Sequence, residues 1–262
     1  MILSFKSLSS PTHSKNEDNF LCDEKLKLFA VFDGMGGYIG GHNASKIAAD
    51  SILKFFKNQN GKKAINRSFI KDVLIFASKK ITEDGRKNLR PDQGTTATVV
   101  KIIDQKITIA NVGDSRSYAV NKRNQLVRLT LDHSPLTDLI QASQISEKVA
   151  HKIDQAKSHH DLSPQGLLIF ARRNVITNAL GSAFNPKDIN IKEVNLVDFR
   201  KLILTTDGVH DNLTDDQIKR AIKMAKNPKD IAKSLVDAAH KVSLSHPFRS
   251  KADDITAVVV VL

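Results

Sequence analysis

The stretch FAVFDGMGG, residues 29–37, is an apolar run typical of a β-strand that ends in an aspartate and a cluster of glycines. A buried strand of this kind places Asp33 at its C-terminal end, and glycines leave the backbone bare enough for a carbonyl to approach an ion closely. A dinucleotide-binding loop needs glycines at positions one, three and six, but the sixth position counted from Gly34 is Ile39, and the Gly-Lys-Ser/Thr of a P-loop is absent. Two interpretations remain: a metal ligand, or an Asp-Gly pair that forms only a turn.

The same pattern recurs twice. LILTTDG (202–208) again ends an apolar run in Asp207, and ADDITAVVVVL (252–262) places Asp253 and Asp254 before a long apolar run. Clustered hard oxygen ligands suit magnesium or manganese, and several carboxylates can hold two divalent ions about 3.5–4 Å apart. Two such ions convert a water into hydroxide and clamp the oxygens of a displacement at phosphorus. The recurrence therefore predicts a metal enzyme.

The composition predicts one globular domain with an aliphatic core. The chain has 262 residues, 40% of them apolar and 5% aromatic, with no tryptophan, and its composition does not shift sharply along its length. Cys22 is the only cysteine, which excludes an intrachain disulfide and thiolate metal sites and favours a reducing compartment. We expect a cytoplasmic monomer, because no signal peptide and no apolar run of about 18 residues is present. Export as an effector without a recognisable signal peptide stays open.

The chain is basic, with a formal net charge of +12 spread over Lys-rich segments at 54–63, 226–230 and 245–251. Basic residues of nucleic-acid-binding proteins are commonly interleaved with stacking aromatics, and these are not. We therefore expect no nucleic acid as partner and keep a basic nucleic-acid binder as the weaker alternative. Weak attraction to acidic or phosphorylated partners follows from the charge.

Blocks of strands and helices predict an α+β layered domain. A tight turn at DQK and the spacer NVGDS predict an antiparallel meander over 95–120. The segment 133–175 opens as a helix, continues as a polar loop and then follows no single period, which is typical of a functional flap. We expect strands at 26–33, 97–103, 106–112, 116–120, 189–196, 201–206 and 255–262, and helices at 42–57, 67–88, 134–155, 214–225 and 228–245.

Eight motifs in one order resemble the metal-dependent protein phosphatases of type 2C, the PPM family, in their compact bacterial form. The resemblance covers nearly the whole chain and implies a four-layer α-β-β-α sandwich of two antiparallel sheets flanked by antiparallel helix pairs. It implies a single catalytic domain over 1–262 with a flap excursion around 133–175. The motifs are NEDNF (16–20), FAVFDGMGG (29–37), QGTTATVV (93–100), NVGDSR (111–116), LTLDHSP (129–135), VITNALGS (175–182), LTTDGVHDNL (204–213) and DDIT (253–256).

The resemblance implies roles for individual residues of the metal site. Asp33 would bridge two metals and the Gly34 carbonyl would bind one of them. Asp207 and Asp253 would complete the other, and Asp114 with Asp207 would hold a third ion. Two further acidic residues would contact metal-bound water: Glu17 and Asp18.

Several positions depart from the family pattern. His13 stands where the family generally has an arginine that grips phosphate; a histidine has lost much of its charge at neutral pH, so substrate binding should suffer. His13 could instead be a surface loop residue, with Lys15 as another possible anchor. Asp254 replaces the usual asparagine, which leaves open whether it or Asp253 is the ligand.

Two differences concern the flap and the leaving group. Asn178 replaces the arginine usual in VITNALGS, and the flap is longer than in compact members, so we expect substrate choice to depend on it. Met35 follows the Asp-Gly, so that water or another side chain must protonate the departing serine oxygen.

The resemblance implies a Mn²⁺- or Mg²⁺-dependent serine/threonine protein phosphatase with two ions and a position for a third, and no organic cofactor. Phosphoserine or phosphothreonine in protein substrates would be hydrolysed by a metal-bridging hydroxide. The alternative is a catalytically weak or inactive phosphatase-like binding module, favoured by His13 and Asn178 and opposed by the complete set of carboxylates.

Overall fold

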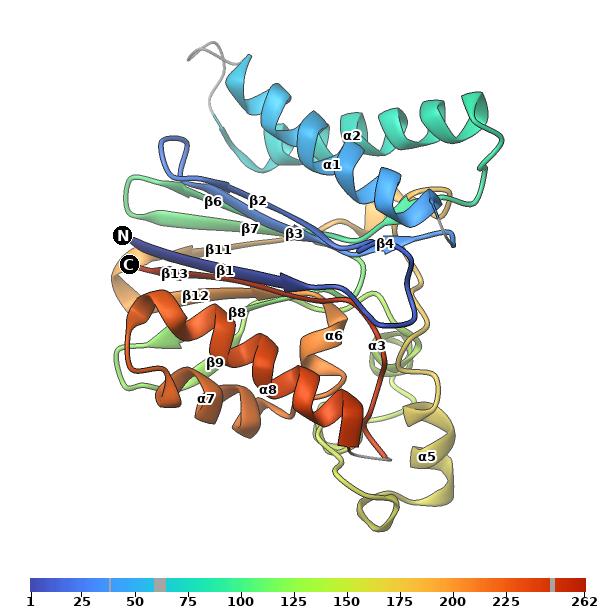
Figure 1. The fold of residues 1–262 in the computed structure, drawn as a ribbon, viewed down its shortest axis with the longest axis vertical. Coiled ribbons are helices and arrows are strands. Elements are labelled where there is room, and N and C mark those ends of the chain that lie inside the picture. Colours follow the sequence, from blue (N-terminus) through green and yellow to red (C-terminus); the bar gives the residue numbers. More distant parts are fainter. Residues whose placement is uncertain (38, 59–64, 246–247) are drawn as a thin grey trace.

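A computed structural model describes residues 1–37, 39–58, 65–245 and 248–262, and parts of the Lys-rich segments at 54–63 and 245–251 lie outside them. Two five-stranded antiparallel sheets pack face to face, and helices cover the outer face of each (Figure 1). The order is β1-β13-β12-β8-β9 in one sheet and β11-β7-β6-β3-β2 in the other. The predicted α+β, four-layer α-β-β-α sandwich is confirmed. The strands are β1 (Ile2–Leu8), β2 (Asn19–Asp23), β3 (Leu28–Phe32), β6 (Ala97–Ile103), β7 (Lys106–Val112), β8 (Arg116–Asn121), β9 (Leu126–Arg128), β11 (Asn190–Asn195), β12 (Phe199–Thr205) and β13 (Ile255–Val261).

The central strands are buried on both faces, and their side chains alternate between two cores. On β3, Leu28, Ala30 and Phe32 pack under the helices, whereas Phe29 and Val31 face the other sheet. Alternation with a period of two is the rule for a strand, so each such strand links two apolar layers. Continuous apolar runs in the sequence correspond to these doubly covered strands.

Two helix pairs complete the layers. Helices α1 (Gly40–Lys57) and α2 (Arg67–Lys87) cover the sheet that contains β3, and α7 (Asp215–Met224) and α8 (Ile231–Ser245) cover the sheet that contains β13 (Figure 1). Asn66 fixes the start of α2, because its side-chain oxygen accepts a hydrogen bond from the Phe69 backbone N–H at 3.0 Å. Among the helices of the described residues, none is long and apolar enough to cross a membrane.

The predicted meander over 95–120 is only half right. β6 and β7 pair as an antiparallel hairpin, with Asp104 at positive φ (50°) in the turn. β8 does not join them; it pairs with β12 and β9 in the other sheet. Gly113 has φ +96°, a backbone conformation that glycine adopts without strain, and a Cβ there would lie 2.5 Å from the Thr96 side chain. The chain therefore crosses from one sheet to the other at 113–115.

The predicted helix at 134–155 is wrong in one respect: it consists of two helices, α3 (Pro135–Gln141) and α4 (Glu147–Asp154). Ser143 has φ 56°, which ends a right-handed helix, and the Ser146 side chain caps the next helix by accepting from Val149 N–H. The loop predicted after them contains a further helix, α5 (Pro164–Phe170). The flap excursion thus contains three short α-helices, and α5 lies away from the sandwich in Figure 1.

Three edge strands escaped prediction: β1, β2 and β9. β1 runs antiparallel to β13, with Ile2 opposite Val261, and β2 pairs with β3. β2 and β9 are mostly half-buried, and β1 mixes exposed and half-buried residues, so their apolar alternation is weak. Three very short strands near the site form the sheet β10-β5-β4: β4 (Gly34–Met35), β5 (Gly94–Thr95) and β10 (Leu180–Gly181).

Candidate metal centre

The acidic residues singled out in the sequence converge from both sheets at one end of the sandwich. Asp33 follows β3, Asp207 opens the short helix α6 (Asp207–His210) after β12, and Asp253 precedes β13. β4 and α6 lie at this same end (Figure 1). Burial raises the pKa of Asp33 well above its usual range, and the negative charges of Asp207, Asp18 and Asp253 raise it further. The crossover at 113–115 brings Asp114 to the same cluster, where burial and Asp207 raise its pKa.

The backbone around Asp33 is held by two threonines and leaves no room for a side chain at position 34. The Asp33 N–H donates to Thr96 Oγ1, and the Asp33 carbonyl accepts from Thr95 Oγ1, each at 2.9 Å. A Cβ on Gly34 would lie 2.2 Å from the Gly41 carbonyl oxygen and 2.6 Å from that of Glu17. Glycine is therefore required at this position by close packing.

Glu17 and Asp18 lie in the loop between β1 and β2. Asp18 is buried, and its Oδ2 accepts from Thr206 Oγ1 at 2.7 Å, which ties this loop to the end of β12. Burial raises the pKa of Asp18 well above its usual range, although hydrogen bonds from Thr256 and Thr206 oppose this. Glu17 is half-buried, and burial raises its pKa as well.

The adjacent carboxylates Asp253 and Asp254 have different environments. Asp254 is 2% exposed, and its oxygens accept from the backbone N–H groups of Ser10 and Glu17, both at 2.6 Å. Its Oδ2 also lies 3.0 Å from His13 Nδ1. Asp253 is 22% exposed at the side chain, and Oδ2 lies 3.0 Å from Lys251 Nζ. Asp254 thus clamps the loop that precedes β2, and Asp253 faces the cluster.

His13 lies beside the cluster but is oriented towards Asp254. Partial burial lowers the pKa of His13, but the hydrogen bond and charge of Asp254 outweigh this and raise it above its ordinary value. Together with Glu17 and Gly37 it lines a small surface cavity. Lys15 is exposed, and among the described residues it forms no ion pair with the acidic cluster.

The expected ligands Asp33, Asp207 and Asp253 lie near one another, but their carboxylate oxygens do not all come within 4.8 Å of one another. Within the described ranges, the one group of three acidic or histidine side chains whose donor atoms all lie within 4.8 Å is His13, Asp253 and Asp254. Lys251 Nζ contacts Asp207 Oδ2 and Asp253 Oδ2, so an ammonium stands between two of the expected ligands.

Two buried carboxylate atoms test whether a divalent ion fits here. Asp114 Oδ1 and Asp207 Oδ1 are both fully buried and have no hydrogen-bond partner among the described residues. A buried carboxylate oxygen without a hydrogen-bond partner destabilises the fold, and a cation bound to that oxygen would remove this cost. The donors are hard oxygens, so the site fits Mg²⁺ or Mn²⁺.

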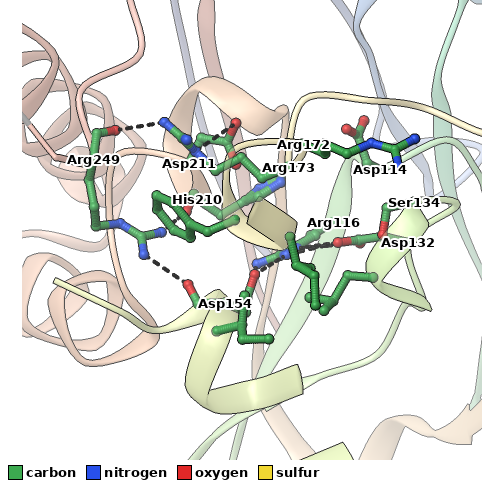
Figure 2. A pocket seen from close by; sticks show the side chains of 14 residues that line it. Asp114, Arg116, Asp132, Ser134, Asp154, Arg172, Arg173, His210, Asp211 and Arg249 are labelled. Carbon is green, nitrogen blue, oxygen red and sulfur yellow. Dashed lines mark hydrogen bonds and ion pairs between the residues drawn. The ribbon is translucent and has the colours of Figure 1, made fainter. Parts of the chain in front are cut away.

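Next to this cluster, beneath the flap, lies a cavity lined by arginines and carboxylates (Figure 2). Arg116 Nη2 donates to Asp132 Oδ2 at 2.8 Å and to Asp154 Oδ1 at 2.6 Å, which joins β8 to flap helix α4. Arg249 donates to the carbonyls of Asp154 and His210, both at 2.8 Å. These contacts anchor the flap to the sandwich.

Asn178, which replaces a family arginine, makes local hydrogen bonds with Asn185 within the part of the chain that the structure describes. It is 1% exposed, donates to the Asn185 carbonyl at 3.1 Å and accepts from the Asn185 N–H at 2.9 Å. The sequence interpretation missed Lys251, Arg116 and Arg249. Arg116 lies within NVGDSR, so its motif could have indicated a role, but no spacing signal marked Lys251.

Comparison with known proteins gives consistent matches. The family model of protein phosphatase 2C matches residues 4–139. A putative protein phosphatase 2C-type of Streptococcus pyogenes serotype M6 is 24% identical over 265 residues, covering 99% of this chain and 97% of that protein. The Mycobacterium tuberculosis serine/threonine phosphatase PstP/Ppp has a TM-score of 0.78 at 20% identity, covering 100% of this chain and 98% of that one. The catalytic domain of serine threonine protein phosphatase PstP in complex with 2 manganese ions has a TM-score of 0.74 at 19% identity, covering 98% and 96%. The two solved structures show that the fold is shared.

Proposed function

Because this chain belongs to the protein phosphatase 2C family, metal-dependent serine/threonine protein phosphatases, we propose that it hydrolyses phosphoserine and phosphothreonine in proteins with Mn²⁺ or Mg²⁺. The observation that carries the proposal is the buried cluster of carboxylates with unsatisfied oxygens at Asp114 and Asp207. A buried excess of hard oxygen donors calls for divalent cations.

We assign the ligands as follows. Asp33 would bridge two ions and the Gly34 carbonyl would bind one of them, since close packing excludes any side chain at position 34. Asp207 and Asp253 would complete the other ion. Asp253 is preferred over Asp254, because the Asp254 oxygens already accept from two backbone N–H groups. Asp114, whose Oδ1 is unsatisfied, would hold a third ion with Asp207.

The divalent ions, when bound, would supply an acidified water as nucleophile and offset the charge of the phosphate. Asp18, fixed by the Thr206 hydroxyl, and Glu17 would accept hydrogen bonds from water at the site and orient it. His13 would contact the phosphate only after giving up its bond to Asp254. A neutral or reoriented imidazole is a weaker phosphate ligand than a guanidinium, so we expect a raised KM.

We further propose that residues 1–262 act as one catalytic domain, with the flap helices beside the cleft. Phosphorylated proteins are the proposed substrates, and the protein is proposed to act as a cytoplasmic monomer. The single, half-buried Cys22 is compatible with a reducing compartment.

The direct test is hydrolysis of p-nitrophenyl phosphate and of a phosphothreonine peptide by metal-stripped protein to which Mn²⁺ or Mg²⁺ is added back. We expect turnover with metal, none with EDTA, and a loss of at least about 1,000-fold in Asp33→Asn, because Asp33 would hold the ions that would supply the acidified water. Asp237→Asn, which removes only a surface ion pair with Lys233, is the matched control and should retain full activity.

The alternative, an inactive phosphatase-like binding module, predicts Mn²⁺ binding without turnover. Calorimetry and activity measured on one preparation separate the two. Absence of turnover with every divalent ion in the wild type, with the fold intact by circular dichroism, would contradict the proposed activity.

A further inference from the structure

Lys251 is the cation closest to the proposed metal ligands, and nothing in the phosphatase reaction requires a lysine there. Its Nζ forms ion pairs with Asp207 and with Asp253, the latter at 3.0 Å, and lies 3.5 Å from Asp211 Oδ2. The side chain is only 19% exposed. Two of these three carboxylates are the ones assigned above to a single divalent ion.

The backbone of Lys251 is fixed by a buried amide. The Asn212 side chain accepts from the Lys251 N–H at 2.9 Å and donates to the Lys251 carbonyl at 3.1 Å. The same amide donates to the Gly208 carbonyl at 2.9 Å, and Asn212 itself is fully buried. Lys251 is thereby tied to α6, the helix that begins with Asp207. The ammonium reaches the cluster from an anchored position rather than from a free surface loop.

A cation at this place cannot coexist with a divalent ion bound by the same two carboxylates. An ion held by Asp207 and Asp253 would sit about 2.0–2.6 Å from their oxygens, within contact distance of Nζ, and two positive charges at that separation repel strongly in a buried site. The lysine stem has freely rotating bonds, so the ammonium can withdraw while its backbone stays in place.

We propose that Lys251 is a tethered competitor of the metal: its ammonium occupies the position of the ion shared by Asp207 and Asp253, and withdraws when that ion binds. The inference rests on the proposed function, which assigns these two residues as ligands. In the metal-free protein Lys251 offsets the repulsion among the carboxylates and stabilises the fold. In the metal-bound protein that stabilisation is lost, so metal affinity at this position is reduced.

The test is calorimetric titration of metal-stripped protein with MnCl₂, combined with thermal unfolding in EDTA and in Mn²⁺. Lys251→Gln removes the charge at nearly constant length. We expect it to bind Mn²⁺ about 10- to 100-fold more tightly than the wild type, within the usual range of coupling between two ligands. In EDTA its Tm should fall by roughly 2–4 °C, so the rise in Tm on adding Mn²⁺ should be larger than for the wild type.

Two further variants control the experiment. Lys251→Arg keeps a competing cation and should bind Mn²⁺ as weakly as the wild type. Lys101→Gln removes another lysine, which is 7% exposed and whose Nζ donates to the backbone carbonyls of Leu26 and Ile102 away from the carboxylates, and should leave the Mn²⁺ affinity unchanged.

The outcomes separate this inference from the proposed function. Equal Mn²⁺ affinity in the wild type and Lys251→Gln would overturn the competitor role and leave the phosphatase assignment standing. Binding of Mn²⁺ by neither protein would overturn both. Tighter binding by Lys251→Gln, with Lys251→Arg resembling the wild type, would support the competitor role even before activity is measured.

Discussion

Two clusters of buried charge lie next to each other in this molecule and are balanced in different ways. Beneath the flap, the Arg116 guanidinium donates to both Asp132 and Asp154, so positive and negative groups are paired (Figure 2). In the candidate metal centre the carboxylates outnumber the cations. That cluster contains Asp33, Asp114, Asp207, Asp211 and Asp253, with Lys251 as their principal counter-charge.

The two clusters shift carboxyl pKa values in opposite directions. Burial by itself would raise the pKa of Asp154, yet Arg116 and Arg128 hold it well below its usual range. Burial raises the pKa of Asp33, and neighbouring aspartates add to the effect. The paired network is therefore part of the scaffold, whereas a buried cluster with an excess of carboxylates is a candidate site for a bound cation.

The largest stability effect is expected for Arg116→Met. This side chain is 6% exposed and joins β8 to the flap through Asp154. Removing one member of a buried ion network costs about 3–5 kcal/mol, because the partner charges stay behind unpaired. Urea unfolding measures the loss. Lys233→Met, which removes an ion pair whose two side chains are 65% and 52% exposed, is the control and should leave the free energy of unfolding nearly unchanged. Equal losses in the two variants would contradict the distinction between a buried network and a surface pair.

A pH effect of intermediate size should separate Asp154 from the metal centre. Its folded pKa is depressed, so its contribution is fully present above the unfolded value of about 3.9 and is lost as pH falls below it. Hydrogen bonds to charged groups contribute about 1.5–3 kcal/mol, and we expect the wild type to lose about that much on acidification. Asp154→Asn should lack this part of the acid limb in denaturation curves recorded between pH 5 and 2. If Asp154→Asn lost stability between pH 5 and 2 as steeply as the wild type, the stabilising role of the Asp154 carboxylate would be contradicted.

A smaller change of opposite sign is expected for Asp33→Asn in EDTA. The substitution removes one charge from a cluster in which burial and like charges already disfavour ionisation. We expect the metal-free protein to gain about 1 kcal/mol at pH 7, at the expense of function. The same Asp-to-Asn exchange at position 154 should lower stability. If both variants are destabilised alike in EDTA, the contrast between the two clusters is wrong.

The smallest expected effect concerns the phosphate. His13→Arg places a permanent charge beside Asp254 and Glu17, and we expect kcat/KM for a phosphopeptide to rise about 3- to 10-fold through a lower KM. Lys15→Arg, at an exposed neighbour, is the control. An unchanged or lower kcat/KM in His13→Arg would show that the phosphate does not depend on this position.

Prediction from the sequence succeeded where one local pattern has one structural outcome. β3 and β13 are buried on both faces and appear as continuous apolar runs. β1 was not predicted, because its side chains are mostly exposed or half-buried and carry little pattern, and it is ordered by pairing with β13. The strand at 116–121 was found, but its sheet was wrong, because pairing is a long-range property that the local alternation does not encode.

The same division holds in the site. Asp33 and Asp207 were identified because each ends an apolar run in Asp-Gly, and the motif order supplied Asp114. The roles of Asp253 and Asp254 could not be separated in sequence, since adjacent residues differ only in what they face. The contacts of Asp254 with Ser10, Glu17 and His13 distinguish them.

The sequence by itself determined the layers of the fold, the family resemblance and the acidic residues of the candidate metal centre. Strand period and strand-end carboxylates are local, and each leaves a pattern in a few consecutive residues. Only the tertiary structure decided the balance of charge. It brought Lys251 between Asp207 and Asp253, and Arg116 between Asp132 and Asp154. Electrostatic energy depends on distance and burial rather than on separation along the chain, so the same residue types form a scaffold in one place and an incomplete binding site in the other.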